Sequence, residues 1–454
     1  MGTAVTHPDT SSLAPPPAYS PISDRDTGAA PLERRDWSLA QRVGFRALFT
    51  YVVLYTFPGP LSELPGTDFI SAPYNAIWKR VVPWFGAHIL HLAKPVSIRP
   101  SGSGDKLYDW VWIAVLIAIS LIVAIVWSRI DRTRRSYPKL FAAFVLYVSL
   151  FLARTMFSYG FDKVIPNQFS PMEPARLTQY IGEASPGGFA WSFLGFSIAY
   201  EIFAGTAEVI SGLLLLFPRT RTLGALVGAG VMTNVFMLNM SFDIPVKQYS
   251  GHLLLMCVFL AALDRERLLN VFLRARDAIP PRPVELFPAP TWKPAAMTAG
   301  VVLALWMIGG SLYGEIRGLY QFGRLAPHGP IYGIFEVERV VKNGTEQTPL
   351  LTDSTLWRRL STSKFAAMVR LATDSLVTYG IRTDTTTHTV RLANGPDSTK
   401  WIKLSYVFSD TNHLALVGRM GADSVEMMLR RRPAGSYLLM SRGFHWMNET
   451  PYFR

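Results

Sequence analysis

The chain has 454 residues, of which 49% are hydrophobic and 17% are charged, and its mean hydropathy is +0.21. The apolar residues gather in runs that approach the ~20 residues that a helix needs to cross a bilayer, so we expect an integral membrane protein. The formal net charge is +13, but Lys and Arg gather in particular loops, as membrane topology requires, and no nucleic-acid motif is present. We therefore expect the lipid bilayer as a partner, and no nucleic acid.

The single cysteine, Cys257, lies inside an apolar run. One thiol forms no internal disulfide and no CxxC motif exists, which argues against thiol–disulfide exchange and against a cysteine-ligated metal. The histidines of the C-terminal region have no partners at metal-ligand spacing. The sequence therefore predicts no metal site.

The N-terminal residues 1–36 are rich in Pro, Ser, Thr and Ala, and no apolar signal-peptide segment precedes the first span, so we expect a disordered cytoplasmic tail. A transmembrane helical domain is predicted over residues 37–313. Its seven predicted spans are 43–57, 110–127, 140–160, 189–217, 222–240, 250–263 and 295–312. The stretch 76–90 mixes aromatic, basic and aliphatic residues, a pattern typical of a helix at the membrane interface.

Positive charge gives the expected orientation. With the N-terminus inside, the inner segments hold 17 Lys and Arg in 89 residues, and the outer segments hold 8 in 89 residues. The positive-inside rule then places the N-terminus in the cytoplasm. We expect a multi-pass protein of the cytoplasmic (inner) membrane, with everything after Tyr313 outside.

The C-terminal region 325–454 differs in kind, because its apolar residues alternate with polar ones in short runs. The clearest runs are 334–340, 389–392, 402–407, 413–417 and 425–429. Period-2 alternation indicates half-buried strands, and turn signals such as Asn343-Gly344 separate them. We predict an extracytoplasmic antiparallel β domain of seven or eight strands, either a sandwich or a small up-and-down barrel.

Two carboxylates, Glu201 and Glu208, lie in the fourth predicted span, seven residues apart and so on one helix face. A charge at the bilayer centre costs about 2.5–3.5 kcal/mol on insertion scales, which points to a proton relay or a polar clamp for a headgroup or quinone. The alternative is structural. Arg154 lies ~10 Å below the outer end of its span and Glu201 ~16 Å below the end of its own, so the two could form a buried ion pair.

Further polar residues mark the rim of the predicted bundle: Asp162, Lys163, Asn234, Asp243, Lys247 and His252. Rim charges are commonly just solvated, and an Asn in a span commonly bonds a neighbouring helix. Their convergence supports a second interpretation, in which His252 exchanges protons near neutral pH and a lysine holds an anionic group. The candidate catalytic residues are Glu201, Lys163 and Arg154. The candidate ligand-binding residues are Glu208, Asn234, Asp243, Lys247 and His252.

Between residues 138 and 265, an aromatic-Gly…Lys motif ends one predicted helix and a Glu…Gly motif occupies the next. The residues are Tyr159-Gly160-Phe161-Asp162-Lys163, Gln168-Phe169, Glu201, Gly205, Glu208, Gly212 and Pro218-Arg219-Thr220-Arg221. This combination resembles the DoxX family of small membrane proteins. The run 243–252 and the closing run 442–446 resemble a larger DoxX-related subgroup with an extra outer domain.

The resemblance implies a four-helix membrane core in which Lys163 and Glu201 carry the function. One branch of the family is a subunit of a quinone-reducing thiosulfate oxidoreductase, and other members are linked to redox homeostasis. Three additional spans and the β domain depart from the family pattern, so the thiosulfate activity is not carried over.

Two hypotheses follow. In the first, the chain is a quinone- or lipid-linked redox protein, a membrane oxidoreductase subunit with a membrane-associated redox partner. In the second, it is a non-enzymatic anchor that presents an outer β-barrel for binding. The buried carboxylates favour the first. The absence of any haem, flavin or iron–sulfur motif means that no cofactor is evident, and it favours the second or a subunit role.

Overall fold

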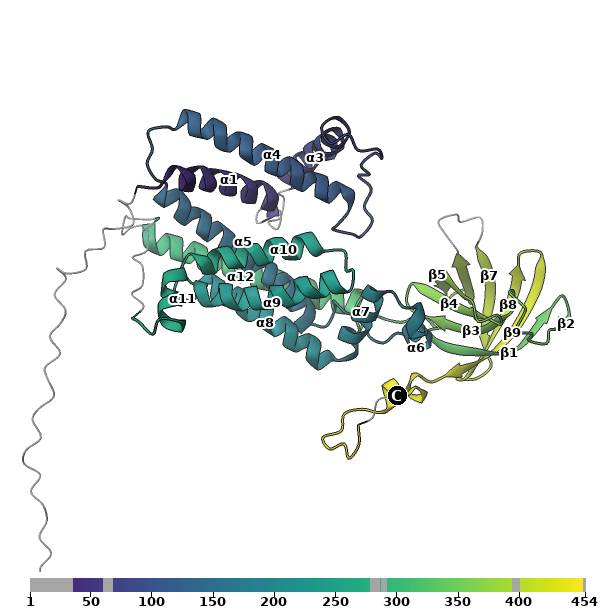
Figure 1. The fold of residues 1–454 in the computed structure, drawn as a ribbon. Helices are drawn as coiled ribbons and strands as arrows, with labels where there is room; N and C mark the ends of the chain where they lie inside the picture. The colour runs from purple at the N-terminus through teal and green to yellow at the C-terminus, as the bar shows by residue number, and fades with distance from the viewer. Residues whose placement is uncertain (1–35, 60–67, 278–285, 287–291, 394–400, 452–454) are drawn as a thin grey trace, which may run out of the picture.

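The computed structural model describes residues 36–59, 68–277, 286, 292–393 and 401–451. The predicted tail 1–36 lies outside these residues, apart from Asp36. A bundle of long helices occupies one part of the molecule, and a separate β-barrel lies at one end of it (Figure 1). We call that end of the bundle the barrel end.

The first helices form a group along one side of the bundle (Figure 1). They are α1 (Leu39–Thr56), α3 (Asp68–His88) and α4 (Leu107–Ile130), and α4 packs along α1. A capping box starts α1, because Ser38 Oγ accepts from the Gln41 amide while Gln41 Oε1 accepts from the Ser38 amide. The predicted interfacial stretch 76–90 overlaps α3, which begins earlier in the chain and ends at His88.

The remaining bundle is built around α5 (Pro138–Val164). Helices α8 (Ile198–Leu216) and α10 (Lys247–Ala262) pack against it, and α9 (Arg221–Ser241) packs against α8 and α10. The short elements α6 (Pro174–Thr178), η2 (Ile181–Glu183) and α7 (Pro186–Phe196) lie at the barrel end, and α11 (Arg265–Phe272) lies at the other end (Figure 1). Helices α5 and α8 approach closely because glycines face each other: a Cβ on Gly205 would lie 2.5 Å from the Gly160 oxygen.

The fourth predicted span, 189–217, is not one helix. It is broken at Ser197, whose extended backbone (φ −107°, ψ 100°) ends α7 and begins α8. Ser197 Oγ accepts a hydrogen bond from the Tyr200 amide, an N-cap that favours a new helix start over continuation. The prediction of one continuous span was wrong here because it used hydropathy alone, which does not register a cap.

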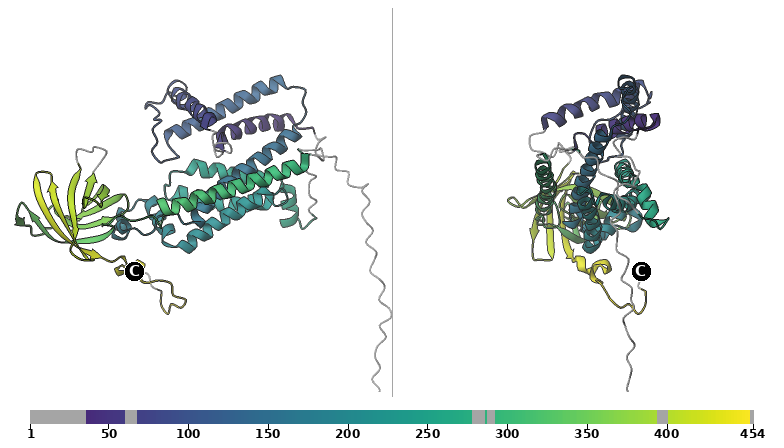
Figure 2. Two further views of the ribbon diagram at one scale, coloured as in Figure 1. Left: turned by 180° about the vertical axis from the view of Figure 1, so that it is seen from behind. Right: turned by 90° about the vertical axis from the view of Figure 1, so that its left-hand side faces the viewer.

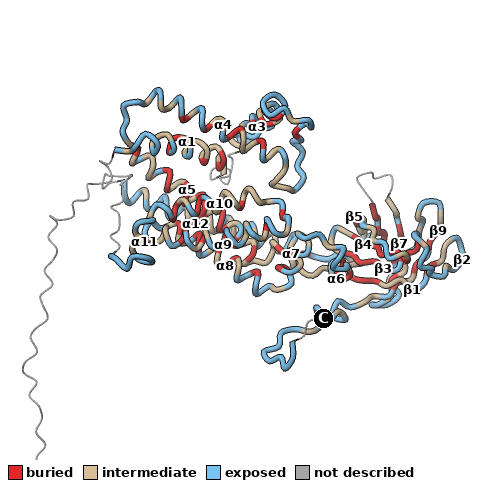
Figure 3. The backbone as a smooth tube through the Cα atoms, in the orientation of Figure 1, coloured by how far each residue is buried: buried red, intermediate tan, exposed pale blue. Residues whose placement is uncertain are grey.

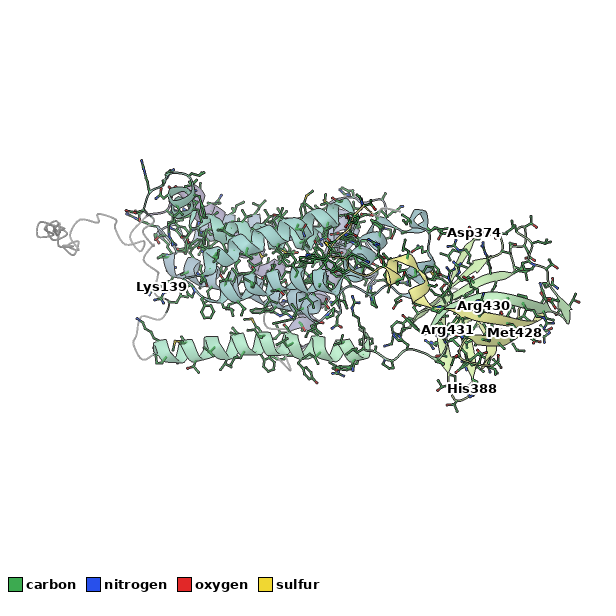
Figure 4. The ribbon with its side chains drawn as sticks, turned by 90° about the horizontal axis from the view of Figure 1, so that it is seen from below. Lys139, Asp374, His388, Met428, Arg430 and Arg431 are labelled. Atoms are coloured by element: carbon green, nitrogen blue, oxygen red, sulfur yellow. The ribbon has the colours of Figure 1, made fainter. Side chains whose placement is uncertain are left out.

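Helix α12 (Trp292–Gln321) runs beside the bundle, and none of its 30 described residues is buried (Figure 2). Seen from below, it lies along the edge of the helix bundle (Figure 4), and it contacts α5. Met307, Ile308 and Leu312 pack against the core that the other helices bury. It extends past residue 313, the predicted limit of the helical domain, and leads towards the barrel.

Five helices within the described ranges are long and apolar enough to cross a membrane: α4, α5, α8, α9 and α12. They indicate a membrane protein. Two further predicted spans correspond to α1, with 18 residues, and α10, with 16 residues. These two pack in the bundle but fall outside the group of five, so the count of seven spans and the orientation stay predictions.

The C-terminal domain is an up-and-down barrel, which decides between the two predicted β architectures. Its strands are β1 (Gly333–Lys342), β2 (Thr345–Glu346), β3 (Trp357–Thr362), β4 (Ala366–Leu371), β5 (Leu376–Asp384), β6 (Thr389–Ala393), β7 (Ile402–Phe408), β8 (His413–Met420) and β9 (Asp423–Arg432). All described neighbours are antiparallel, in the order β2-β1-β3-β4-β5-β6-β7-β8-β9. Strand β9 also pairs with β1, so eight strands close into a barrel.

The barrel core consists of the inward residues of the alternating runs, including Phe335, Val369, Leu404, Leu416 and Leu429, each 0% exposed. Buried residues therefore form two separate bodies, one among the helices and one inside the barrel (Figure 3). After β9 the chain continues through η4 (Ala434–Ser436) and α13 (Leu438–Ser441), which return towards the bundle (Figure 1).

Candidate functional site

Lys163 and Glu208 form a buried ion pair at the closest approach of α5 and α8. Lys163 Nζ lies 2.8 Å from Glu208 Oε2, and the two side chains are 8% and 2% exposed. The ammonium group also donates to the Tyr159 carbonyl at 3.2 Å. A buried charge is tolerated when it is paired and hydrogen-bonded, so each of these residues depends on the other.

Glu201 pairs with Arg324, a residue of the segment between α12 and β1. Arg324 Nη2 lies 3.1 Å from Glu201 Oε2, while Glu201 Oε1 accepts from the Phe169 amide at 3.2 Å. The same guanidinium donates to the carbonyls of Phe169 and Gly195. This pair therefore joins the start of α8 and the loop after α5 to the segment that leads into the barrel.

The predicted pairing of Glu201 with Arg154 was wrong. Because the span is broken at Ser197, Glu201 lies in the first turn of α8, not ~16 Å along a continuous helix. Arg154 lies nine residues before Lys163, about 13 Å away along α5. There it interacts electrostatically with Tyr159 and Tyr249.

A second contact joins α5 to α12. Asn167 Nδ2 donates to Glu315 Oε2 at 3.1 Å and to the Glu315 carbonyl at 2.7 Å. The carboxyl group of Asp162 also lies close enough to that of Glu315 to interact with it electrostatically. Glu315 lies in α12, three residues beyond the last predicted span, and was not among the candidates.

The predicted rim residues do not converge on one mouth. Lys247 pairs with Asp243 at 2.7 Å, one turn apart, and the Asp243 side chain is 84% exposed. His252 faces α1 instead: its Nε2 lies 2.6 Å from the Tyr51 hydroxyl, and its ring stacks on Tyr55. Asn234 is exposed on α9. The candidates therefore belong to separate clusters: Lys163, Glu201 and Glu208 lie near one another, and Asp243 and Lys247 form a separate pair.

The barrel contains a cavity at the mouth where β1 ends and β9 begins, away from the segment that enters β1. Its volume is about 380 Å³. The lining is mostly apolar and aromatic, with Trp357, Val377, Tyr379, Ile402 and Met427 among it. At its rim Lys342 Nζ lies 2.9 Å from Asp423 Oδ2, and this hydrogen bond holds the pKa of Asp423 below its usual range.

A further ion pair fastens the side of the barrel to the loop at the barrel end. Arg370 of β4 is 3% exposed and donates two hydrogen bonds to Glu183 of η2, one of them at 2.8 Å. Its guanidinium lies 4.3 Å from the centre of the Tyr180 ring, and Thr178 is hydrogen-bonded to Ser361 at 2.9 Å. The bonds from Arg370 hold the pKa of Glu183 below its usual range.

Within the described part of the chain, no group of three or more His, Cys, Asp or Glu side chains is placed to hold a metal ion.

Comparison with known proteins gives one informative match. A Bacillus subtilis (strain 168) protein described as "Uncharacterized protein YwoB" is 38% identical over 141 residues, which are 31% of this chain and 84% of that protein. No family model matches the chain, and no solved structure matches it. The resemblance to DoxX stays a prediction.

Proposed function

This chain belongs to the same family as YwoB of Bacillus subtilis, and we propose that it is a membrane-anchored binding protein whose barrel takes up a small apolar molecule. The observation that carries the proposal is the cavity of about 380 Å³ at the barrel mouth. An eight-stranded barrel is just wide enough to hold one small ligand. Ligand sites of a few hundred Å³ with an apolar lining and few polar groups are the common kind.

The helix bundle supports this proposal as a scaffold. The intramembrane carboxylates Glu201 and Glu208 each have a cation within hydrogen-bonding distance, so their charges are used to hold helices together. The pair of Glu201 with Arg324 also fixes the segment that carries the barrel. In the orientation that the positive-inside rule predicts, the barrel stands outside the cytoplasmic membrane and its mouth faces away from the helices.

The test is photolabelling of the full chain in detergent with a neutral apolar diazirine, followed by mapping of the labelled peptides. We expect label on the peptides of Trp357, Tyr379 and Met427, and on the lipid-facing helices as an internal reference. Val377→Trp should reduce the barrel label roughly tenfold or more, because the indole would occupy volume in the cavity that the probe needs. Thr378→Trp is the matched control, because Thr378 is exposed and absent from the cavity lining. Equal labelling of both variants would contradict the proposal.

The redox hypothesis has a separate supporting observation in the contact of His252 with Tyr51, a hydrogen-bonded aromatic pair between α10 and α1. As a second candidate, the bundle would bind a quinone, with Glu201, Lys163 and Arg154 handling protons. Solvent extraction of the purified protein tests this. This candidate is supported if quinone is extracted from the wild type and not from Glu201→Gln. It is contradicted if neither protein contains quinone.

A further inference from the structure

Four basic residues lie side by side on the outer surface of the barrel. The register pairs Arg382 of β5 with Arg391 of β6, Arg391 with Lys403 of β7, and Lys403 with Arg419 of β8. Residues directly opposite each other in a sheet point to the same face, and all four are exposed. We call these four residues the basic row. With strands about 4.8 Å apart, the row is about 14 Å long.

The four charges of the basic row have one carboxylate close by, that of Asp384, which interacts electrostatically with Arg391. Among the ion pairs of the described residues, none includes a member of the row. The neighbouring carboxylate of Asp384 accepts hydrogen bonds from the amides of Thr386 and Thr387. Like charges directly opposite each other destabilise a sheet. Four in succession therefore cost the barrel stability, which a bound anion would restore.

The opposite side of the barrel shows the contrast. On β1, β3 and β9 the basic side chains have acidic partners: Arg339 with Glu346, Arg359 with Glu336, and Arg430 with Glu338. Figure 4 labels Arg430 on that side. Basic residues are thus neutralised locally on one side and left unbalanced on the other.

Arg382, at one end of the row, also lines a second cavity, of about 770 Å³. Arg382 and Trp401 line it together, with the guanidinium 5.2 Å from the centre of the indole ring. Lys364 lines it too, and its ammonium group lies over the rings of Phe322 and Phe365. The cavity therefore includes one cation of the basic row and a second cation, and both lie against aromatic rings.

We propose that the basic row binds a linear polyanion that crosses strands β5 to β8 and ends in the cavity of Arg382, Lys364 and Trp401. A line of exposed cations at near-constant spacing fits an extended anionic chain, since successive charges of the chain can each meet one side chain. Arginine guanidinium groups suit phosphate in particular, because they donate in a planar fork. This site is separate from the apolar mouth and does not depend on the ligand proposed for it.

The probe is inorganic polyphosphate of defined length, added to the full chain in detergent and measured by fluorescence anisotropy of an end-labelled chain. We expect binding that weakens roughly 50-fold between 50 and 200 mM salt, as four contacts on a flexible polyanion predict. Orthophosphate at the same phosphate concentration should compete weakly, because it meets one or two cations at a time. Strong competition by orthophosphate would indicate a single-phosphate site and overturn the proposal.

The decisive variant replaces all four residues of the row by Gln: Arg382→Gln, Arg391→Gln, Lys403→Gln and Arg419→Gln. It removes repulsion, so it should fold at least as stably and should lose at least tenfold in affinity. A matched control removes the same charge from positions that have acidic partners, including Arg358 with Asp374 and Arg432 with Glu336: Arg339→Gln, Arg358→Gln, Arg430→Gln and Arg432→Gln. Equal losses in both variants would reduce the effect to net charge and contradict the proposal. Binding of the wild type to anionic phospholipid vesicles but not to polyphosphate would contradict it as well.

Discussion

The bundle and the barrel treat charge in opposite ways. Inside the bundle, Lys163 and Glu208 are buried together, and Glu201 is buried with Arg324. On the barrel, the four residues of the basic row are exposed to solvent and lie opposite one another on neighbouring strands. An unpaired charge is very costly in an apolar interior but costs little in water, so only the interior forces pairing. The comparison teaches that the intramembrane charges hold the structure together, and that the unbalanced ones on the barrel are free to bind.

The largest effect should come from breaking the buried pair of the bundle. Glu208→Leu leaves the Lys163 ammonium without its carboxylate and should destabilise the protein by about 3–5 kcal/mol. Lys163→Met added to Glu208→Leu removes both charges and should recover most of that loss. Thermal unfolding in detergent measures both. A double variant as unstable as the single one would mean that the charges do more than pair.

An intermediate effect is expected where the two regions meet. Glu183→Gln weakens the hydrogen bonds that hold Arg370 against η2, and should destabilise the docking by roughly 1.5–3 kcal/mol. Hydrogen exchange of the β4 and α6 amides should rise, while β7 and β8, on the far side of the barrel, should keep their protection. Uniform loss of protection across the barrel would show that the pair stabilises the barrel fold instead of its docking.

The same pair should make the docking sensitive to acid. The folded pKa of Glu183 lies below its ordinary value of 4.5, so the stability it contributes is present above that value and is lost as pH falls through the lowered folded pKa. The difference in unfolding midpoint between wild type and Glu183→Gln should therefore be constant at pH 5–7 and shrink below about pH 4. If the difference in unfolding midpoint persists at pH 3, where Glu183 is protonated, the stabilisation does not come from the charge of Glu183.

The smallest effect should have the opposite sign on the two sides of the barrel. Arg391→Gln removes two like-charge oppositions and should stabilise the barrel by about 0.2–1 kcal/mol. Arg430→Gln removes an exposed partner of Glu338 and should cost up to about 1 kcal/mol. Unfolding midpoints at low and high salt test this, because screening should reduce both differences.

The sequence predicts the secondary elements better than their contacts. Alternation in runs such as 402–407 was enough to predict the strands, and hydropathy located the five long apolar helices, because each signal is local. Lys163 and Glu208 could be nominated because charges in an apolar run are visible in the sequence. The sequence could not predict that these two residues pair, because the pairing depends on how closely two glycines let α5 and α8 approach.

The missed residues share a physical reason. Arg324 and Glu201 are 123 positions apart, and Arg370 and Glu183 are 187 apart, with one partner of each pair outside the helices. The basic row was equally hidden, since its members are neighbours only through the register of four strands. An arginine in a loop or on a strand is ordinary by composition, and the fold alone reveals what it faces.

The pairing of β9 with β1 has one more consequence. A sheet that stops would present a line of free amide and carbonyl groups to which another chain could add a strand. In this barrel the ladder of eight strands returns to its start, and only the two-residue β2 extends beyond it. Copies crowded together in one bilayer can therefore meet barrel to barrel without a template for edge-to-edge aggregation.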